Sequence, residues 1–294
     1  MNKLSSFGIW GNTEKESFWE VLPSIIEWSK KKNIEPYITS RIFEHSNWDG
    51  QEAKVIKTEK ILEKLDFMLV LGGDGTFLSL ARVKESCHIP ILGIHLGDLG
   101  FLAQVTLQGL FHRLDQVAKG DFIIEKRILI KSHIQKDNKI INHLALNDFV
   151  ISNAESYRML NATVFINEHF VGNYRADGIV VATPTGSTAY SLSAGGPIVT
   201  PQVDAIIITP IAAHTLTSRP LVVSGNDKIM IEFSNNNQPV LFTSDGQIHE
   251  NLDVNNKVKI AKADYQIKLI SFTDNDYFKN LKEKMGWGKR GEDS

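Results

Sequence analysis

One short apolar run that ends on glycines constrains this chain more than any other stretch. Residues 66–76 read Asp-Phe-Met-Leu-Val-Leu-Gly-Gly-Asp-Gly-Thr, a strand-forming segment followed by a glycine turn. Apolar residues at helical spacing follow, which predicts a helix with Thr76 near its N-terminus as a cap. Backbone N–H groups at such a turn favour phosphate, and glycines at 72, 73 and 75 permit close approach and positive φ. Asp74 is then a carboxylate in a loop suited to anions, although an Asp between glycines also suits a simple turn.

Strand-like and helix-like segments alternate through the first 119 residues. This alternation predicts a parallel sheet with helices on its faces, and ligands bind beyond the carboxyl ends of such strands. Both glycine loops, at 72–76 and 95–102, fall at that edge. The expected strands are 7–10, 34–39 (with Pro36 more tolerable on an edge), 66–71 and 89–94. The expected helices are 77–83, 107–118 and a stretch around 53–65. A further helix is expected from a Thr13–Glu16 capping box to about residue 32, and Pro23 inside it should kink or restart the helix.

Beyond Gly120 the pattern becomes mainly β. The expected strands are 128–135 and 139–146 around a hairpin turn at 136–138, then 159–167, 179–182, 205–209, 228–233, 240–243 and 258–272. A short helix is expected at 277–285. We therefore expect an α/β domain over residues 1–119 and a mainly β domain over 120–273, with 274–294 packing back on the first domain.

Composition narrows the functional classes. The net charge of −2 does not support a general nucleic-acid or anionic-membrane binder. No apolar run reaches the roughly 18 residues of a membrane span, and the first residues lack the apolar core of a signal peptide. The single cysteine, Cys87, excludes an intramolecular disulfide and fits a reducing compartment. A cytoplasmic protein without nucleic-acid or membrane partners is expected.

Two stretches of the second half are too polar to be ordinary strand connections. One runs from Tyr174 to Pro197 and contains Thr-Pro-Thr-Gly-Ser-Thr-Ala-Tyr at 183–190; the other is Leu-Asn-Asp at 146–148. Hydroxyl, amide and carboxylate groups suit sugar hydroxyls and amides, and Tyr190 offers a ring face for stacking on a base. A hydroxyl-rich turn that caps a helix is the alternative interpretation of residues 185–193.

Together these motifs resemble the NAD kinase family. The resembling segments are 72–76, 99–102, 147–148, 177–178, 183–190, 209–211 with His214, and 219–221. Diacylglycerol kinases, sphingosine kinases and phosphofructokinases carry similar glycine–aspartate loops, whereas the run at 183–190 is much more specific. Two departures stand out: His95 replaces an asparagine common in bacterial relatives, and Ala212-Ala213 replaces a common Cys-Pro before His214.

The resemblance implies an α/β domain and a β-sandwich domain with the NAD site between them. It implies transfer of the terminal phosphoryl group of ATP to the adenosine 2′-hydroxyl of NAD, giving NADP, with Asp74 as proton acceptor. Asn147 and Asp148 would contact ribose hydroxyls or the nearby phosphate region, and the base and ribose pockets would be lined by Thr188, Ala189, Tyr190 and Ser193. The implied binding residues are Gly73, Gly75, Thr76, Phe101, Asn147, Asp148, Arg158, Arg175, Asp177, Thr188, Ala189, Tyr190, Ser193 and Gln247.

The expected metal is magnesium carried on the ATP phosphates, with no metal ligands from the protein. A homo-oligomer, dimer or tetramer, is implied by the resemblance. Two alternatives stay open: a lipid kinase, for which no basic amphipathic helix is visible, and a non-catalytic dinucleotide sensor. A G-x-G-x-x-G dehydrogenase motif and a P-loop are both absent. The use of polyphosphate, the acceptance of NADH and feedback by NADPH or NADP are left open.

Overall fold

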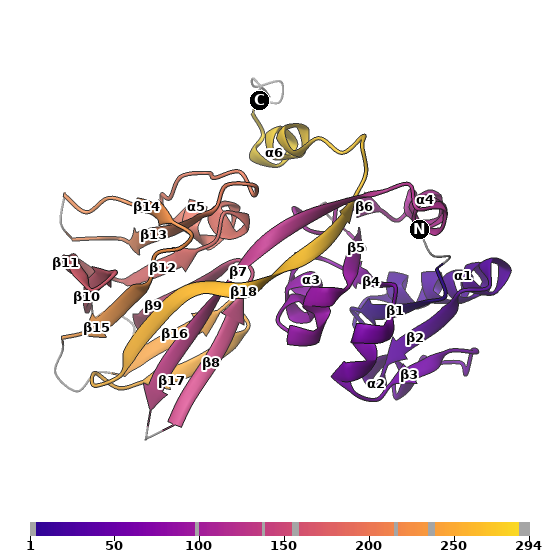
Figure 1. Ribbon diagram of the computed structural model, residues 1–294, viewed down its shortest axis with the longest axis horizontal. Coiled ribbons are helices and arrows are strands. Elements are labelled where there is room, and N and C mark those ends of the chain that lie inside the picture. The colour runs from indigo at the N-terminus through magenta and orange to yellow at the C-terminus, as the bar shows by residue number, and fades with distance from the viewer. Residues whose placement is uncertain are drawn as a thin grey trace. The chain divides into compact units, whose positions relative to one another are not determined.

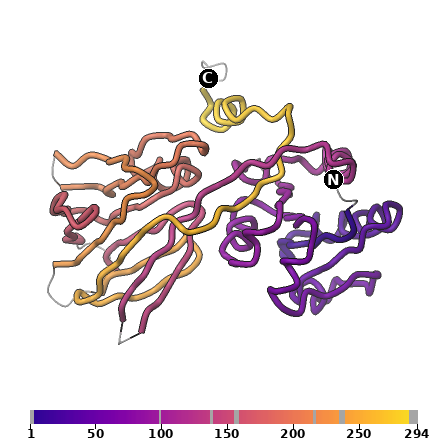
Figure 2. The backbone as a smooth tube through the Cα atoms, viewed as in Figure 1, coloured from indigo at the N-terminus to yellow at the C-terminus, as the bar shows by residue number. Residues whose placement is uncertain are grey.

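The computed structural model describes residues 4–97, 100–136, 139–154, 159–214, 217–234 and 239–287. The chain, which can be followed by colour in Figure 2, divides into two compact units. The N-terminal unit comprises residues 1–125 and 267–294, and the C-terminal unit comprises residues 126–266. The domain limits expected at residues 119 and 273 stay a prediction. In the described ranges, no helix is both long and apolar enough to cross a membrane.

The N-terminal unit is built on a parallel sheet, as expected (Figure 1). Its strand order is β3-β2-β1-β4-β5, and β6 and the end of β18 also pair with β5 in parallel. The strands are β1 (Ser6–Gly11), β2 (Glu35–Thr39), β3 (Lys54–Ile56), β4 (Phe67–Gly72), β5 (Pro90–His95), β6 (Val105–Thr106) and β18 (Lys257–Ser271). The helices are α1 (Glu16–Lys32), α2 (Ser40–Phe43), α3 (Asp74–Ala81), α4 (Leu110–Lys119) and α6 (Tyr277–Met285), with 3₁₀ turns η1 (Glu59–Lys64) and η2 (Lys84–His88).

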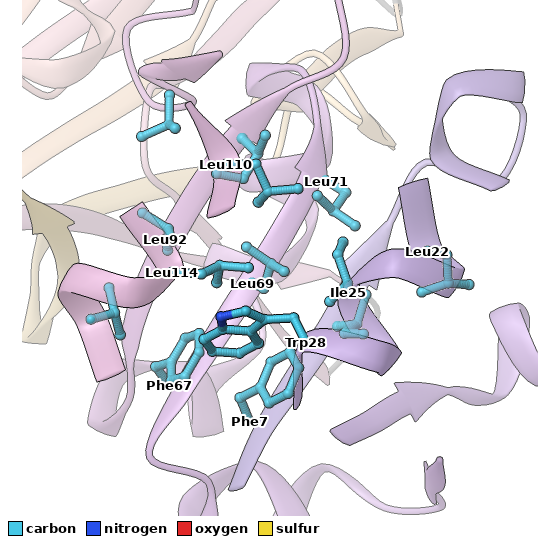
Figure 3. Close-up of a cluster of buried hydrophobic side chains, with 14 of the residues drawn as sticks. Phe7, Leu22, Ile25, Trp28, Phe67, Leu69, Leu71, Leu92, Leu110 and Leu114 are labelled. Carbon is cyan, nitrogen blue, oxygen red and sulfur yellow. The ribbon is translucent and has the colours of Figure 1, made fainter. Parts of the chain in front are cut away.

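The central strand β4 is buried along its whole length. Phe67, Leu69 and Leu71 pack in a cluster to which α1 contributes Trp28 and α4 contributes Leu114 (Figure 3). Alternate residues of a strand point to opposite faces, so the apolar residues between them, which are also buried, face the other side of the sheet. Burial on both faces explains why the apolar run is continuous. The glycine turn begins where this buried strand ends, at Gly72.

The C-terminal unit contains two antiparallel sheets. One has the order β11-β10-β15-β18, with β7 pairing with β18 and β8; the other has the order β14-β13-β12-β9-β16-β17. The long strands β7 and β18 lie side by side (Figure 1). The strands not yet given are β7 (Ile123–Lys136), β8 (Lys139–Ala145), β9 (Asp148–Asn153), β10 (Leu160–Ile166), β11 (His169–Ala176), β12 (Gly178–Ala182), β13 (Ala205–Ile211), β14 (Leu221–Ser224), β15 (Ile229–Phe233), β16 (Val240–Ser244) and β17 (Ile248–Leu252). A 3₁₀ turn, η3 (Thr185–Thr188), and a short helix, α5 (Tyr190–Ser193), follow β12.

A single hydrophobic core joins the two sheets of the C-terminal unit. Phe149 of β9 and Phe242 of β16 come from one sheet, and Val164 of β10 and Ile231 of β15 come from the other. All four side chains are fully buried. Two sheets packed face to face over a shared core form a β-sandwich, so the fold class expected for this half is confirmed.

Several local predictions for the N-terminal half are wrong. The stretch 53–65 is strand β3 followed by η1, because residues 54–56 pair with β2. Helix α1 continues through the exposed Pro23 without restarting. No side chain caps this helix, so the capping box at Thr13 does not form. Pro36 is not on an edge strand, because β2 lies between β1 and β3; pairing with β3 begins only at Tyr37.

Some strands of the sandwich were not predicted. These are β9, β11, β14 and β17, together with the two-residue β6 of the first unit. Strand β7 begins at Ile123, earlier than expected, whereas α6 has the predicted limits of 277 and 285. The predicted turn at 136–138 includes two positions, 137 and 138, that lie outside the described residues. Most of the missed strands are short or half exposed, so their apolar pattern is weak.

Candidate active site

Asp74 is the first residue of α3, and only Gly73 separates it from the end of β4. Its carboxylate accepts three backbone hydrogen bonds from one loop: Oδ2 from the N–H of Phe101 at 2.8 Å, and Oδ1 from those of Leu102 and Ala103 at 3.0 and 3.1 Å. Three donors of fixed direction hold the carboxyl group in one orientation. We call residues 100–103 the clamp loop. The structure therefore brings two of the predicted site residues, Asp74 and Phe101, into direct contact.

Glycine stands at the positions around Asp74 for different structural reasons. A Cβ on Gly72 would lie 2.2 Å from Thr76 Oγ1, so glycine lets the Thr76 side chain pack there. A Cβ on Gly73 would meet no described atom within 4 Å, so space is open beside this residue. Gly72, Gly73 and Gly75 do not use the positive φ that glycine permits. Thr76 lies inside α3, whose N-cap is Gly73, so its predicted role as the cap is wrong.

The second glycine loop begins at the end of β5, next to the first. His95 pairs with Gly72 across the two strands, and its Nδ1 lies 2.6 Å from the carbonyl oxygen of Gly97. Positions 98 and 99 lie outside the described residues. A Cβ on Gly100 would lie 1.9 Å from Asp74 Oδ1, so only glycine lets the clamp loop approach this closely. Both loops lie at the carboxyl edge of the sheet, as expected.

Lys15 is a cation near these loops that the sequence analysis did not single out. It precedes α1, and its Nζ donates to the carbonyl oxygen of Leu96 at 3.2 Å. The side chain is exposed, and it would approach a Cβ on Gly97 to 3.0 Å. No local motif distinguishes it from other surface lysines, because only the parallel pairing of β1, β4 and β5 places it at this edge.

In the C-terminal unit, polar groups gather around Asp245. Its carboxylate accepts backbone hydrogen bonds from Leu146, Asn147 and Asp148 at 3.1, 2.8 and 3.1 Å. Asp245 and Gly246 both have positive φ, and the N–H of Gln247 donates to the carbonyl oxygen of Ser244. These features define a two-residue hairpin turn. Asp-Gly is the sequence signal for this turn, and it could have revealed both the β16–β17 hairpin and the role of Asp245.

Asp148 is a buried carboxyl group beside another carboxylate. Burial raises its pKa to about 7, and the charge of Asp245 acts in the same direction. The backbone N–H of Tyr190 donates to the Asp148 carboxyl group and opposes this rise. A carboxyl group that changes its protonation state near neutral pH is typical of functional sites.

The run at 183–190 packs against the same Asn147–Asp148 segment. The N–H of Thr183 donates to the carbonyl oxygen of Asn147 at 2.8 Å, and the Thr183 hydroxyl donates to that of Leu146. A Cβ on Gly186 would lie 2.1 Å from the carbonyl oxygen of Asn147. No side chain of the run caps α5. The Thr183 hydroxyl does accept the N–H of Gly186 in η3, and the hydroxyls of Ser187 and Thr188 donate to carbonyl oxygens three residues earlier, so the run also forms the hydroxyl-rich turn of the alternative interpretation. Thr188 and Ala189 are half-buried, and Tyr190 and Ser193 are exposed.

The remaining predicted residues lie elsewhere. Arg175 and Asp177 are exposed and precede β12, whereas the hydroxyl run follows this strand. At about 3.3 Å per residue, the length of β12 separates the two groups by roughly 16 Å. Gln247 is exposed on the hairpin turn beside Asp245. Arg158 lies outside the described residues.

The acidic groups do not form a metal cage. Within the described ranges, no three His, Cys, Asp or Glu side chains are grouped to hold a metal ion. Both carboxylate oxygens of Asp74 already accept N–H groups. Magnesium carried on the ATP phosphates stays a prediction, because such an ion keeps its waters and needs no protein cage.

Two family profiles cover most of the chain. The ATP-NAD kinase N-terminal domain matches residues 8–122, and the ATP-NAD kinase C-terminal domain matches residues 146–272. The NAD kinase of Thermoanaerobacter sp. (strain X514) is 40% identical over 283 residues, which are 96% of this chain and 99% of the relative. The NAD kinase of Clostridium botulinum (strain Loch Maree / Type A3) is 37% identical over 287 residues, 98% of each chain.

Solved structures give the same result. A yeast NADH kinase complexed with NADH has a TM-score of 0.92 and 27% identity, covering 100% of this chain and 91% of that one. An NAD kinase from Archaeoglobus fulgidus in complex with ATP has a TM-score of 0.74 and 25% identity, and the match covers 96% of this chain and 98% of that one. The two profiles, the near-complete relatives and the fold all agree with the resemblance seen in the motifs. The chain therefore belongs to the NAD kinase family of enzymes.

Proposed function

We propose that this enzyme transfers the terminal phosphoryl group of ATP to the adenosine 2′-hydroxyl of NAD. The 2′-oxygen attacks the γ-phosphorus, the bond from that phosphorus to the β–γ bridging oxygen breaks, and ADP leaves. The carboxylate of Asp74 accepts the proton that the hydroxyl loses. Phosphoryl transfer asks the protein mainly for positioning and charge stabilisation.

The observation that carries this proposal is the fixed carboxylate of Asp74. Three N–H groups of the clamp loop orient it, and open space lies beside Gly73, the preceding residue. A general base must stand within hydrogen-bond reach of the proton that it removes. Gly75 and Thr76 lie in the first turn of α3, at the positive end of the helix dipole, which favours a phosphate nearby.

Magnesium bound to the ATP phosphates would neutralise part of their charge. The carboxylates described above leave no protein cage for it, so we propose that it enters with ATP. We propose that Lys15, an exposed cation at the same edge of the sheet, contacts the phosphates. These assignments concern the donor side of the reaction.

For the acceptor, we propose that Asn147 and Asp148 contact the ribose. The base and ribose pockets would be lined by residues 188–190 and Ser193, with Tyr190, whose side chain is 46% exposed, available for stacking. Roles for Arg175, Asp177, Gln247 and Arg158 in holding the dinucleotide stay predictions.

The test measures NADP formation from NAD with ATP and magnesium, for the wild type and for Asp74→Asn. Loss of a general base typically costs a factor of about 10² to 10⁴, so the variant should lose nearly all turnover. Asp121→Asn, the same change at an exposed position of the same unit, is the matched control. Circular dichroism and NAD binding must show that Asp74→Asn is folded.

Each result decides one point. Near-wild-type turnover by folded Asp74→Asn would remove Asp74 as the base. NAD binding by the wild type without product would favour a sensor over a kinase. Inorganic polyphosphate and NADH, tested in parallel, define the donor and acceptor ranges. The proposed dimer or tetramer is measured by light scattering, and the cytoplasmic location by cell fractionation.

A further inference from the structure

The clamp loop is itself held by a neighbouring side chain. The Nε2 of Gln104 donates to the carbonyl oxygen of Phe101 at 2.9 Å. The N–H of the same residue, Phe101, donates to Asp74. Gln104 therefore holds Phe101, whose N–H donates to Asp74 Oδ2. A change in the orientation of the Gln104 side chain would move Phe101 and so alter the hydrogen bond to the carboxylate.

The orientation of Gln104 is set from the far end of the sequence. Asn275, in the short segment between β18 and α6, donates from Nδ2 to Gln104 Oε1 at 3.0 Å. The same Nδ2 also donates to the buried Ser271 hydroxyl at 3.1 Å. Because Oε1 accepts from Asn275, Nε2 must face Phe101; a flipped Gln104 amide would lose both hydrogen bonds.

Helix α6 makes a second, independent contact with the clamp loop. The Nζ of Lys284 lies 4.3 Å from the centroid of the Phe101 ring, within the range of a cation–π interaction. The helix has its own anchors, because Asp276 caps its first turn and Leu281 is buried. Both contacts lie within the N-terminal unit.

We propose that the C-terminal segment 271–287 is a positioning element for catalysis, acting through Asn275, Gln104 and the clamp loop on the carboxylate of Asp74. This inference rests on the proposed role of Asp74 as proton acceptor. Asn275 and Gln104 are positioning residues, since each acts on Asp74 only through the clamp loop. The relay joins residues that are 171 positions apart in sequence, and no local motif reveals it.

Small displacements at the reacting group are enough to matter. A shift of about 1 Å that originates away from the chemistry can cost roughly 10²-fold in rate. Loss of either amide should therefore lower kcat about 10- to 100-fold and change the KM for NAD much less. Because the two amides act in series, removal of both should cost little more than removal of one.

The experiment compares Asn275→Ala, Gln104→Ala and the double variant, with Asn280→Ala of α6 as the matched control. Hydrogen exchange of the amides of residues 101–103 supplies a readout besides activity. Exchange should be faster in both single variants and in Asp74→Asn, but unchanged in Asn280→Ala. Asn275→Asp keeps the shape of the side chain while removing its donor, and it replaces the alanine variant if that one does not fold. Lys284→Met, with Lys282→Met as control, tests the ring contact.

The outcomes separate this inference from the proposed function. Wild-type kcat and wild-type exchange in Asn275→Ala and Gln104→Ala would overturn the relay, even if Asp74→Asn is inactive. Multiplying losses in the double variant would also overturn it, because the two residues would then act independently. Near-wild-type turnover by Asp74→Asn would instead remove Asp74 as the proton acceptor, whereas the exchange data would still report on the clamp loop.

Discussion

The buried carboxyl group of Asp148 gives a quantitative prediction for the variant Asp148→Asn. Burial and the neighbouring charge of Asp245 raise the pKa of Asp148 from 3.8 to about 7. Asparagine has nearly the same shape, and its Oδ1 can still accept the N–H of Tyr190, but it carries no charge at any pH. The variant therefore isolates the free energy of keeping an ionised Asp148 in the folded protein.

The direction in which stability changes with pH follows from the protonation of Asp148 in the folded and the unfolded chain. Below the unfolded pKa, both the folded and the unfolded chain hold this proton. Between that value and about 7 only the folded chain holds it, so wild-type stability falls as the pH rises; above the folded pKa no further change occurs. At about 1.36 kcal/mol per pKa unit, the full penalty is about 4 kcal/mol. Asp148 is only 4% exposed, so water screens little of this penalty.

Urea unfolding of both proteins between about pH 5 and pH 8 measures the effect. The free energy of unfolding of Asp148→Asn minus that of the wild type should increase by about 2 to 3 kcal/mol over this range. Asp253→Asn, at an exposed position of the same unit, controls for the general loss of one negative charge. A difference that is the same at both ends of the range would refute the reasoning, because Asp148 would then not titrate there.

Three further predictions use other parts of the structure. Gly100→Ala should lose most of its turnover while staying folded, because its Cβ would lie 1.9 Å from Asp74 Oδ1; steady-state kinetics and circular dichroism test this. Asp276→Ala removes the cap of α6 and should lower stability by about 1 kcal/mol, measured by thermal unfolding against the wild type. Cys87 is buried, and burial raises the pKa of its thiol, so alkylation near neutral pH should be slow in the native protein and fast in urea; fast native alkylation would contradict its burial.

Sequence reasoning was sufficient wherever the signal was local. The apolar run into Gly72 and Gly73 predicted strand β4, the turn and helix α3, because burial on both faces demands a continuous run. Alternating strand and helix patterns predicted the parallel sheet. Sequence reasoning failed where strand pairing overrode local preference, because residues 54–56 are extended through their pairing with β2. It also misplaced the start of α3, which begins at Asp74 with Gly73 as its N-cap.

By itself, the sequence determined the fold class of each half and the chemical groups of the candidate site, because periodicity and motifs are properties of neighbouring residues. Only the tertiary structure decided what those groups contact. Asp74 meets the clamp loop 27 residues later, Asp148 meets Asp245 at a separation of 97, and Gln104 meets Asn275 at 171. Such contacts depend on strand order and register, which bring distant segments together and leave no periodic trace in the chain.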